Sequence, residues 1–122
     1  MKVVVFGGSG FLGSFVGNIL AEQGHSVIIY DKIPSPYLLH NERMVVADIF
    51  DQQCVDKTVR GSDIVYNFAG IADIEEASRM PLETVKTNIL GTAIILEACK
   101  KAKVKRFIFA SSIYVYSRTG GF

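Results

Sequence analysis

A cluster of glycines directly behind an apolar strand constrains this chain more than any other feature. Lys2–Phe6 is a short apolar run, and residues 7–13 then read Gly-Gly-Ser-Gly-Phe-Leu-Gly. The next apolar residues recur in pairs every four positions, as on one face of a helix; they are Phe11, Leu12, Phe15, Val16, Ile19 and Leu20. The order strand, glycine turn, helix is the context in which such a pattern indicates dinucleotide binding.

The spacing of the glycines explains why this context matters. The cluster reads as G-x-x-G-x-x-G from its first glycine and as G-x-G-x-x-G from its second. Such glycines allow a tight turn, a close approach to a pyrophosphate and close packing of helix on strand. The helix N-terminus adds free N–H groups and a positive dipole end. We expect the pyrophosphate to contact Gly7, Gly10, Phe11, Leu12 and Gly13, the alternative being a plain turn rich in glycine.

A second strand and an acidic residue complete this unit. Gly24 is placed to end the helix, and Ser26–Tyr30 reads as a buried strand that ends at Asp31. An acidic residue about 20 positions beyond the glycines accepts hydrogen bonds from the adenosine ribose and repels a 2′-phosphate. NAD is therefore favoured over NADP, although Lys32 weakens the preference because it could tolerate a phosphate. The other interpretation of Asp31 is a solvated carboxylate at a strand end.

Composition limits the classes of function. The chain has 122 residues and a net charge of +1, which gives no strong field for nucleic acid or membrane. No apolar run is long enough to cross a membrane, and no signal peptide precedes the first strand. Cys54 and Cys99 lack metal-ligand spacing, and His25 and His40 lack catalytic context. We expect a cytoplasmic protein with reduced cysteines and no metal.

The rest of the chain continues the alternation of strands and helices. We expect an irregular loop over 32–42, strands over 43–47, 63–68 and 105–110, a short helix from the Asp51 cap to Arg60, and a long helix over 81–101. Alternation of this kind predicts one domain over residues 1–122, an α/β Rossmann-type fold. Its doubly wound parallel sheet should have strand order 3-2-1-4-5 and remain incomplete on the C-terminal side.

This topology brings separate loops to one crevice. Ligands of doubly wound sheets bind outside the carboxyl ends of the strands. The residues that follow the predicted strands at this edge are Gly10, Asp31, Asp48, Phe68, Ala69, Gly70 and Ser112. We therefore expect these residues to surround one binding site.

Five short motifs also occur in a fixed order along the chain. They are Gly-Gly-x-Gly-Phe-Leu-Gly at 7–13, Asp-Ile at 48–49, Asn-x-Ala-Gly at 67–70, Pro-Leu at 81–82 with Asn-x-x-Gly-Thr at 88–92, and Arg-Phe-Ile-x-x-Ser-Ser-x-x-Val-Tyr at 106–116. Together they resemble the N-terminal part of the extended short-chain dehydrogenase/reductases, the NAD-dependent epimerase/dehydratase family acting mostly on nucleotide sugars. The resemblance covers the whole chain, with Phe6 in place of a common threonine.

The resemblance implies roles for particular residues. It places Asp48 and Ile49 against the adenine and Ser112 at the sugar oxygen on the carbon that is oxidised. It adds these residues along the cofactor: Phe68, Ala69, Gly70, Asn88 and Ala110. The family base is a tyrosine in Tyr-x-x-x-Lys, where the lysine lowers the tyrosine pKa. No such motif occurs in this sequence, and we interpret Tyr114 and Tyr116 as mainly structural.

Departures from the family pattern narrow the activity. Sugar 4,6-dehydratases carry an acidic pair after the active-site hydroxyl, where this chain has Ile113 and Tyr114. UDP-galactose 4-epimerases carry a lysine two residues after the Ala-Gly turn, where this chain has Ala72. The resemblance then implies an epimerase or a dehydrogenase/reductase acting on another nucleotide sugar. The alternative is a non-catalytic NAD(P)-binding redox sensor or regulatory protein.

The missing tyrosine-lysine pair leads to two further expectations. We expect the chain to be the cofactor-binding part of a longer protein, to lack a C-terminal substrate domain and to be inactive alone. The resemblance implies a nucleotide sugar as the partner of the whole protein and, because family members commonly form homo-oligomers, a homo-oligomer. We also expect the fifth strand, with Phe107 to Phe109, to form an exposed sheet edge that promotes self-association.

Overall fold

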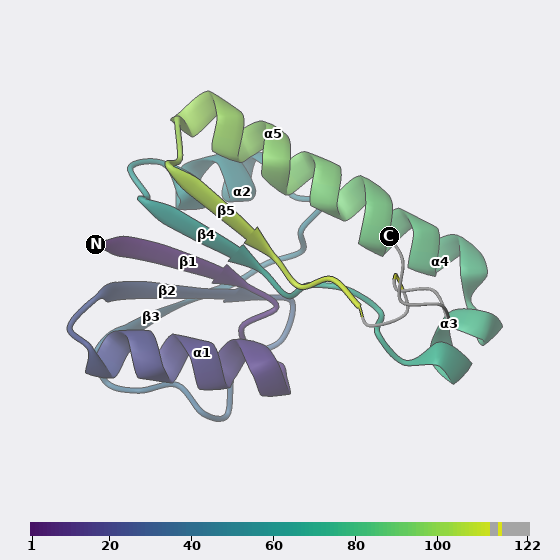
Figure 1. The fold of residues 1–122 in the computed structure, drawn as a ribbon, viewed down its shortest axis with the longest axis horizontal. Helices are drawn as coiled ribbons and strands as arrows, with labels where there is room; N and C mark the ends of the chain where they lie inside the picture. Colours follow the sequence, from purple (N-terminus) through teal and green to yellow (C-terminus); the bar gives the residue numbers. More distant parts are fainter. Residues whose placement is uncertain (113–114, 116–122) are drawn as a thin grey trace.

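The computed structural model describes residues 1–112 and Val115. Ile113, Tyr114 and Tyr116 lie outside these residues, so their expected roles stay predictions. Figure 1 shows one twisted sheet, with α1 on one face and α2 and α5 on the other. Its five parallel strands follow the order β3-β2-β1-β4-β5. The predicted fold class and strand order are therefore confirmed.

The strands and helices alternate along the chain as the sequence predicted. The strands are β1 (Lys2–Phe6), β2 (Ser26–Asp31), β3 (Glu42–Val46), β4 (Ile64–Asn67) and β5 (Arg106–Phe109). The helices are α1 (Phe11–Glu22), α2 (Gln52–Val59), α3 (Ile74–Arg79), α4 (Pro81–Val85), the π-helical turn η1 (Lys86–Gly91) and α5 (Thr92–Ala102). The predicted strand ends differ from these bounds by at most one residue.

Two apolar cores lie on opposite faces of the sheet because successive strand side chains alternate in direction. Val3 and Val5 of β1 join the core beneath α1, where Ala21 is also buried. Val4 and Phe6 join the core beneath α2 and α5, which includes Tyr30 and Ile95. Strands that are buried on both faces account for the continuous Val- and Ile-rich runs.

Local signals fix the ends of the first two helices. Gly24 has φ of +83°, and the Gly24 and His25 N–H groups donate to the Ala21 and Leu20 carbonyls at the end of α1. Asp51 accepts a hydrogen bond from the Cys54 N–H at 3.0 Å and caps α2. Both sequence-based predictions are confirmed.

The region from 74 to 102 differs from the single long helix that we predicted. A separate six-residue helix, α3, precedes Pro81, and the helix from Pro81 is interrupted by η1. The helical spacing of this segment predicts one stripe, apolar except for its last member, made of Leu82, Val85, Ile89, Ala93, Leu96 and Lys100. This stripe faces outward: Leu82 is 87% exposed and Ile89 is 66% exposed. The buried residues of α5 are instead Ile95, Ala98 and Cys99. A helical period identified the helix but not the face that it buries.

The two edges of the sheet differ in charge. The β3 edge carries Glu42 and Arg43, whereas β5 carries one charge, Arg106, and ends at Phe109, which is 52% exposed. Charged side chains protect edge strands from pairing with other chains, and apolar edges invite such pairing. Of the two edge strands, β5 is therefore the one that we expect to pair with another copy of the chain.

We expect the purified chain to self-associate at high concentration through β5. Phe109→Lys should reduce this association, because a lysine opposes edge-to-edge pairing. Light scattering over a concentration series would measure the mass of both proteins, with Val46→Lys on the opposite edge as the control. A wild-type chain that remains a monodisperse monomer would contradict the prediction.

Candidate functional site

A cavity of about 440 Å³ opens at the carboxyl edge of the sheet. Its walls come from the glycine turn, from the ends of β2, β3 and β4, and from helices α3, α4 and η1. The sequence-predicted residues that line it are Gly7, Gly10, Asp31, Lys32, Asp48, Ile49, Phe68, Ala69 and Gly70. The structure thus brings together segments that lie more than 60 residues apart in the sequence.

Packing requires three of the four glycines in the turn. Gly7 has φ of +72°, and a Cβ there would lie 2.5 Å from the Ala69 backbone nitrogen. A Cβ on Gly8 would lie 2.7 Å from the Ile29 side chain, and one on Gly13 would clash with the Gly7 carbonyl oxygen. These glycines permit the close contact of α1 with the sheet.

Gly10 is different, because the protein itself leaves room for a side chain there. Its φ is −75°, which any residue adopts, and the nearest atom to an added Cβ is the Gly7 oxygen at 3.4 Å. Gly10 is exposed and lines the cavity. The space beside it fits a ligand that approaches the backbone closely, as a dinucleotide pyrophosphate does at such a turn.

The N-terminus of α1 meets the same space. Ser14 N–H donates to the Gly10 carbonyl at 2.9 Å, and Gly10 supplies no side-chain cap. The preceding N–H groups, of Phe11, Leu12 and Gly13, are left without partners in the helix. An anion at this position would receive their hydrogen bonds and the positive end of the helix dipole.

Asp31 joins the glycine turn to the end of β2. Its Oδ2 accepts from the Ser9 N–H at 3.0 Å, and its Oδ1 accepts from the Ile33 N–H at 3.3 Å. The Ser9 hydroxyl donates to the Ile33 carbonyl at 2.7 Å and strengthens the same junction. A carboxylate oxygen accepts more than one hydrogen bond, so Asp31 can hold the turn and still bind a ribose hydroxyl. Lys32 beside it is exposed.

The segment after β3 forms the next wall. The buried Tyr30 hydroxyl donates to the Asp48 carbonyl at 2.8 Å, and Asp48 Oδ1 accepts from the Phe50 N–H at 2.9 Å. Burial, with a smaller effect from Cys54, raises the pKa of Tyr30, so the hydroxyl stays a donor at neutral pH. The Lys86 ammonium lies 4.7 Å from the centre of the Phe50 ring. These contacts hold the predicted adenine segment, Asp48 and Ile49, at the cavity.

A polar network positions the loop after β4. Asn67 Oδ1 accepts from the Ala69 N–H at 3.1 Å, and its Nδ2 donates to the Thr92 hydroxyl at 3.1 Å. Asn88 Oδ1 accepts from the Ile71 N–H at 2.8 Å, and its Nδ2 donates to the Ile71 carbonyl at 3.0 Å. The Asn88 carbonyl in turn accepts from the Thr92 hydroxyl at 2.8 Å. Both side-chain amides therefore hold this loop.

Asn88 holds the loop after β4 and does not line the cavity. Its side-chain amide forms hydrogen bonds with both backbone groups of Ile71. The preceding residue, Thr87, lines the cavity instead. Asn88 belongs to η1, and π-helical turns occur often at functional sites. We therefore assign Asn88 an indirect role through Gly70 and Ile71, both of which border the cavity.

Replacing Asn88 tests this role. Asn88→Asp keeps an acceptor for the Ile71 N–H but cannot donate to the Ile71 carbonyl, so it should cost about 1–3 kcal/mol of stability and weaken NAD binding. Urea unfolding and calorimetric titration would measure the two effects. Thr84→Ala is the control, because its hydroxyl bonds to the Met80 carbonyl away from the loop. Unchanged NAD affinity in Asn88→Asp would show that the loop does not depend on this amide.

Six predicted site residues do not line the cavity, namely Phe11, Leu12, Gly13, Asn88, Ala110 and Ser112. Ala110 and Ser112 follow β5 and are exposed, and neither lines the cavity. The Ala110 N–H donates to the Asn67 carbonyl at 3.3 Å, which keeps this segment beside the β4 loop. Sequence reasoning missed several lining residues, namely Phe50, Ile71, Glu76, Met80, Glu83 and Thr87. Glu76, Glu83 and Thr87 belong to α3, α4 and η1, and Met80 lies between α3 and α4. We predicted neither α3 nor the π-helical turn.

No group of three or more His, Cys, Asp and Glu side chains within residues 1–112 and Val115 is arranged to hold a metal ion. In the same part of the chain, no helix has the length and apolar character needed to span a membrane.

Comparison with known proteins identifies a family. The model of the NAD dependent epimerase/dehydratase family matches residues 3–121. UDP-glucose 4-epimerase uge1 of Schizosaccharomyces pombe is 33% identical over 134 residues, which cover 98% of this chain and 38% of that protein. This chain thus spans less than two fifths of the length of that relative.

Solved structures agree with this comparison. The Thermotoga maritima UDP-glucose 4-epimerase, solved with UDP-glucose, has a TM-score of 0.87 and 33% identity, covering 92% of this chain and 38% of that one. The Brucella ovis UDP-glucose 4-epimerase, solved with NAD, has a TM-score of 0.87 and 31% identity, covering 95% of this chain and 37% of that one.

Proposed function

Because this chain belongs to the NAD-dependent epimerase/dehydratase family, we propose that it forms the cofactor-binding half of a nucleotide-sugar epimerase or dehydrogenase/reductase. The cofactor is NAD, and the cavity at the carboxyl edge is its site. The single observation that carries the proposal is Gly10, where neither backbone conformation nor protein packing requires a glycine. A ligand that approaches the backbone closely accounts for it.

The direction that we propose for the cofactor is supported by the family resemblance and by the residues that line the cavity. Asp48 and Ile49 would contact the adenine, Asp31 would accept from the adenosine ribose, and the N-terminus of α1 would bind the pyrophosphate. Asp31 supports NAD over NADP, because a carboxylate repels a 2′-phosphate. The nicotinamide half then extends across the sheet toward β4 and β5.

The chemistry belongs to the whole protein. When NAD is bound, it would supply the hydride acceptor for oxidation of the sugar. In this proposal the Ser112 hydroxyl hydrogen-bonds the sugar oxygen, and a base outside the five motifs removes the proton. Ala72, in the position of the lysine of UDP-galactose 4-epimerases, favours a different nucleotide sugar.

We expect the 122-residue chain to bind NAD without turnover. Loss of a general base alone costs about 10²–10⁴-fold in rate, and loss of substrate positioning costs more. Calorimetric titration with NAD would test the first part. Assays for reduced nicotinamide and for the epimerised sugar, each with a range of nucleotide sugars, would test the second. Absence of NAD binding would contradict the proposed site, and turnover at an enzyme-like rate would contradict the assignment of the base to another segment.

A further inference from the structure

We propose that the aromatic ring of Phe50 contacts the adenine of the bound cofactor and supplies part of its affinity. The inference rests on the proposed function, because it takes the cavity as the NAD site and its Asp48–Ile49 end as the adenine end. Phe50 belongs to none of the five sequence motifs, so the inference adds a ligand-binding residue that the family resemblance does not supply.

Packing within the protein explains Ile49 but not Phe50. Both residues line the cavity and both are partly buried. Ile49 also packs against the core beneath α2 and α5, whereas neither apolar core of the described residues includes Phe50. Apolar surface that remains in contact with water is unfavourable, and a flat apolar ligand in the cavity would cover it.

The turn after β3 ties Phe50 to the segment assigned to adenine. The Phe50 N–H donates to Asp48 Oδ1 at 2.9 Å, and the Asp51 N–H donates to the Asp48 carbonyl at 3.0 Å. An aspartate that accepts from the backbone two residues later fixes a tight turn. Asp48, Ile49 and Phe50 therefore form one rigid unit, and we expect a base bound by the first two residues to reach the third.

Lys86 holds the Phe50 ring at the wall of the cavity. Its ammonium lies over the ring, 4.7 Å from the ring centre, and 3.8 Å from the Glu83 carboxylate. A cation over an aromatic face is attracted by the ring electrons. Thr87, the next residue, and Glu83 both line the cavity. The ammonium occupies one face of the ring, and the opposite face or the edge is left for a second aromatic group, since both arrangements are favourable.

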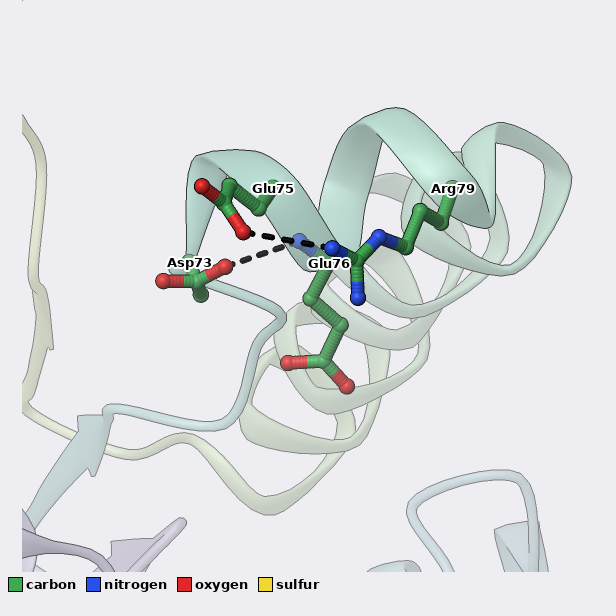
Figure 2. A network of polar contacts seen from close by, with 4 residues as sticks. All are labelled: Asp73, Glu75, Glu76 and Arg79. Carbon is green, nitrogen blue, oxygen red and sulfur yellow. Dashed lines mark hydrogen bonds and ion pairs between the residues drawn. The ribbon is translucent and has the colours of Figure 1, made fainter.

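The neighbouring helix α3 is held by contacts that do not involve Phe50. The Asp73 carboxylate accepts from the Glu76 N–H at 2.8 Å and caps the helix, and Glu75 pairs with Arg79 at 3.3 Å, as Figure 2 shows. The Met80 N–H at the end of the helix donates to the Glu76 carbonyl at 3.0 Å. These contacts stay intact when the Phe50 ring is removed, so a loss of cofactor affinity on its removal would come from the ring.

An aromatic contact of this kind contributes affinity rather than choice of base, because every base has a π face. Loss of the ring should therefore weaken binding at least about fivefold. The same factor should apply to NAD and to ADP-ribose, which share the adenine and differ in the nicotinamide.

Phe50→Leu tests the proposal, with Phe15→Leu as its matched control. Phe15 is exposed on α1 and does not line the cavity. Calorimetry would give the Kd of NAD and of ADP-ribose for each chain. F50L should weaken both ligands by the same factor, about fivefold or more. F15L should leave both unchanged, and Phe50→Tyr, which keeps the ring, should bind both nearly as the wild-type chain does.

A nuclear Overhauser experiment on the wild-type chain tests the contact directly and depends on no variant. With ¹³C-labelled phenylalanine and bound NAD, we expect cross-peaks between the Phe50 ring protons and the H2 or H8 proton of adenine. A ring with a merely structural role would give none.

The outcomes separate this inference from the function on which it rests. If the wild-type chain does not bind NAD, the proposed function fails. If it binds NAD but the Phe50 ring gives no cross-peak to adenine, or gives cross-peaks to the nicotinamide instead, the inference is wrong. Unchanged affinities in F50L, or an equal loss in F15L, would also overturn it.

Discussion

Replacing Gly10 with alanine should remove most NAD binding while leaving the fold intact. The added Cβ would approach nothing in the protein more closely than 3.4 Å, and φ of −75° is accessible to alanine. The same Cβ would enter the space assigned to the pyrophosphate. We expect the affinity for NAD to fall at least about tenfold, which corresponds to about 1.4 kcal/mol. Calorimetry and thermal unfolding would measure the two properties.

Gly13→Ala is the matched control, three residues later in the same turn. Its Cβ would clash with the Gly7 carbonyl oxygen, so the helix and the strand would have to separate. We expect a loss of stability of about 1–3 kcal/mol, as for other overpacked sites. If Gly10→Ala destabilises the chain as much as Gly13→Ala does, or binds NAD normally, the glycine at position 10 does not serve the cofactor.

Asp31→Ala should produce the second large effect. The alanine cannot accept from the ribose hydroxyls, nor from the Ser9 and Ile33 N–H groups that hold the glycine turn. We expect the affinity for NAD to fall by about 1–3 kcal/mol. The affinity for NADP should fall less, because the repulsion of its 2′-phosphate is also removed.

Calorimetric titration with both cofactors would measure this change in preference. Lys32→Ala is a useful comparison, because losing this exposed cation should weaken NADP binding and sharpen the preference for NAD. Equal affinity of the wild-type chain for the two cofactors, unchanged in Asp31→Ala, would contradict the role of Asp31.

The sheet and one side of the site could be predicted from the sequence because their signals are local. The runs Lys2–Phe6 and Ser26–Asp31 are buried on both faces and read as continuous apolar strands. Gly7 and Gly24 adopt positive φ, which few other residues tolerate. Asp31 is the last residue of its strand, so the strand prediction alone placed it at the cavity.

The opposite wall could not be predicted from periodicity. Helix α3 buries none of its residues, so it has no apolar stripe. A weaker signal was present: Asp73 caps the helix and Glu76 follows three residues later, which is the spacing of a helix start. The turn η1 has no comparable local signal, because the contacts that accompany it reach from Asn88 to Ile71 in a distant loop.

The outward stripe on α4, η1 and α5 has a related explanation. A helical period shows that one side is apolar, but the sequence does not show which side meets the sheet. Small residues mark the side that meets the sheet here, since Gly91 and Ala98 are buried while Leu82 and Ile89 are exposed. A Cβ on Gly91 would clash with Ile49, so close packing requires the glycine side to face inward.

Amide chemical-shift mapping with NAD tests the central claim most directly, and a chain of 13.4 kDa is well suited to it. We expect saturable shifts in the amides of residues 7–13, 31–33, 48–50 and 68–71, with the largest changes at the N-terminus of α1. A second cavity lies at the amino ends of the strands, and the residues that line it include Lys2, His40 and Arg43. Shifts that gather there, or no shifts at saturating NAD, would contradict a cofactor site at the carboxyl edge.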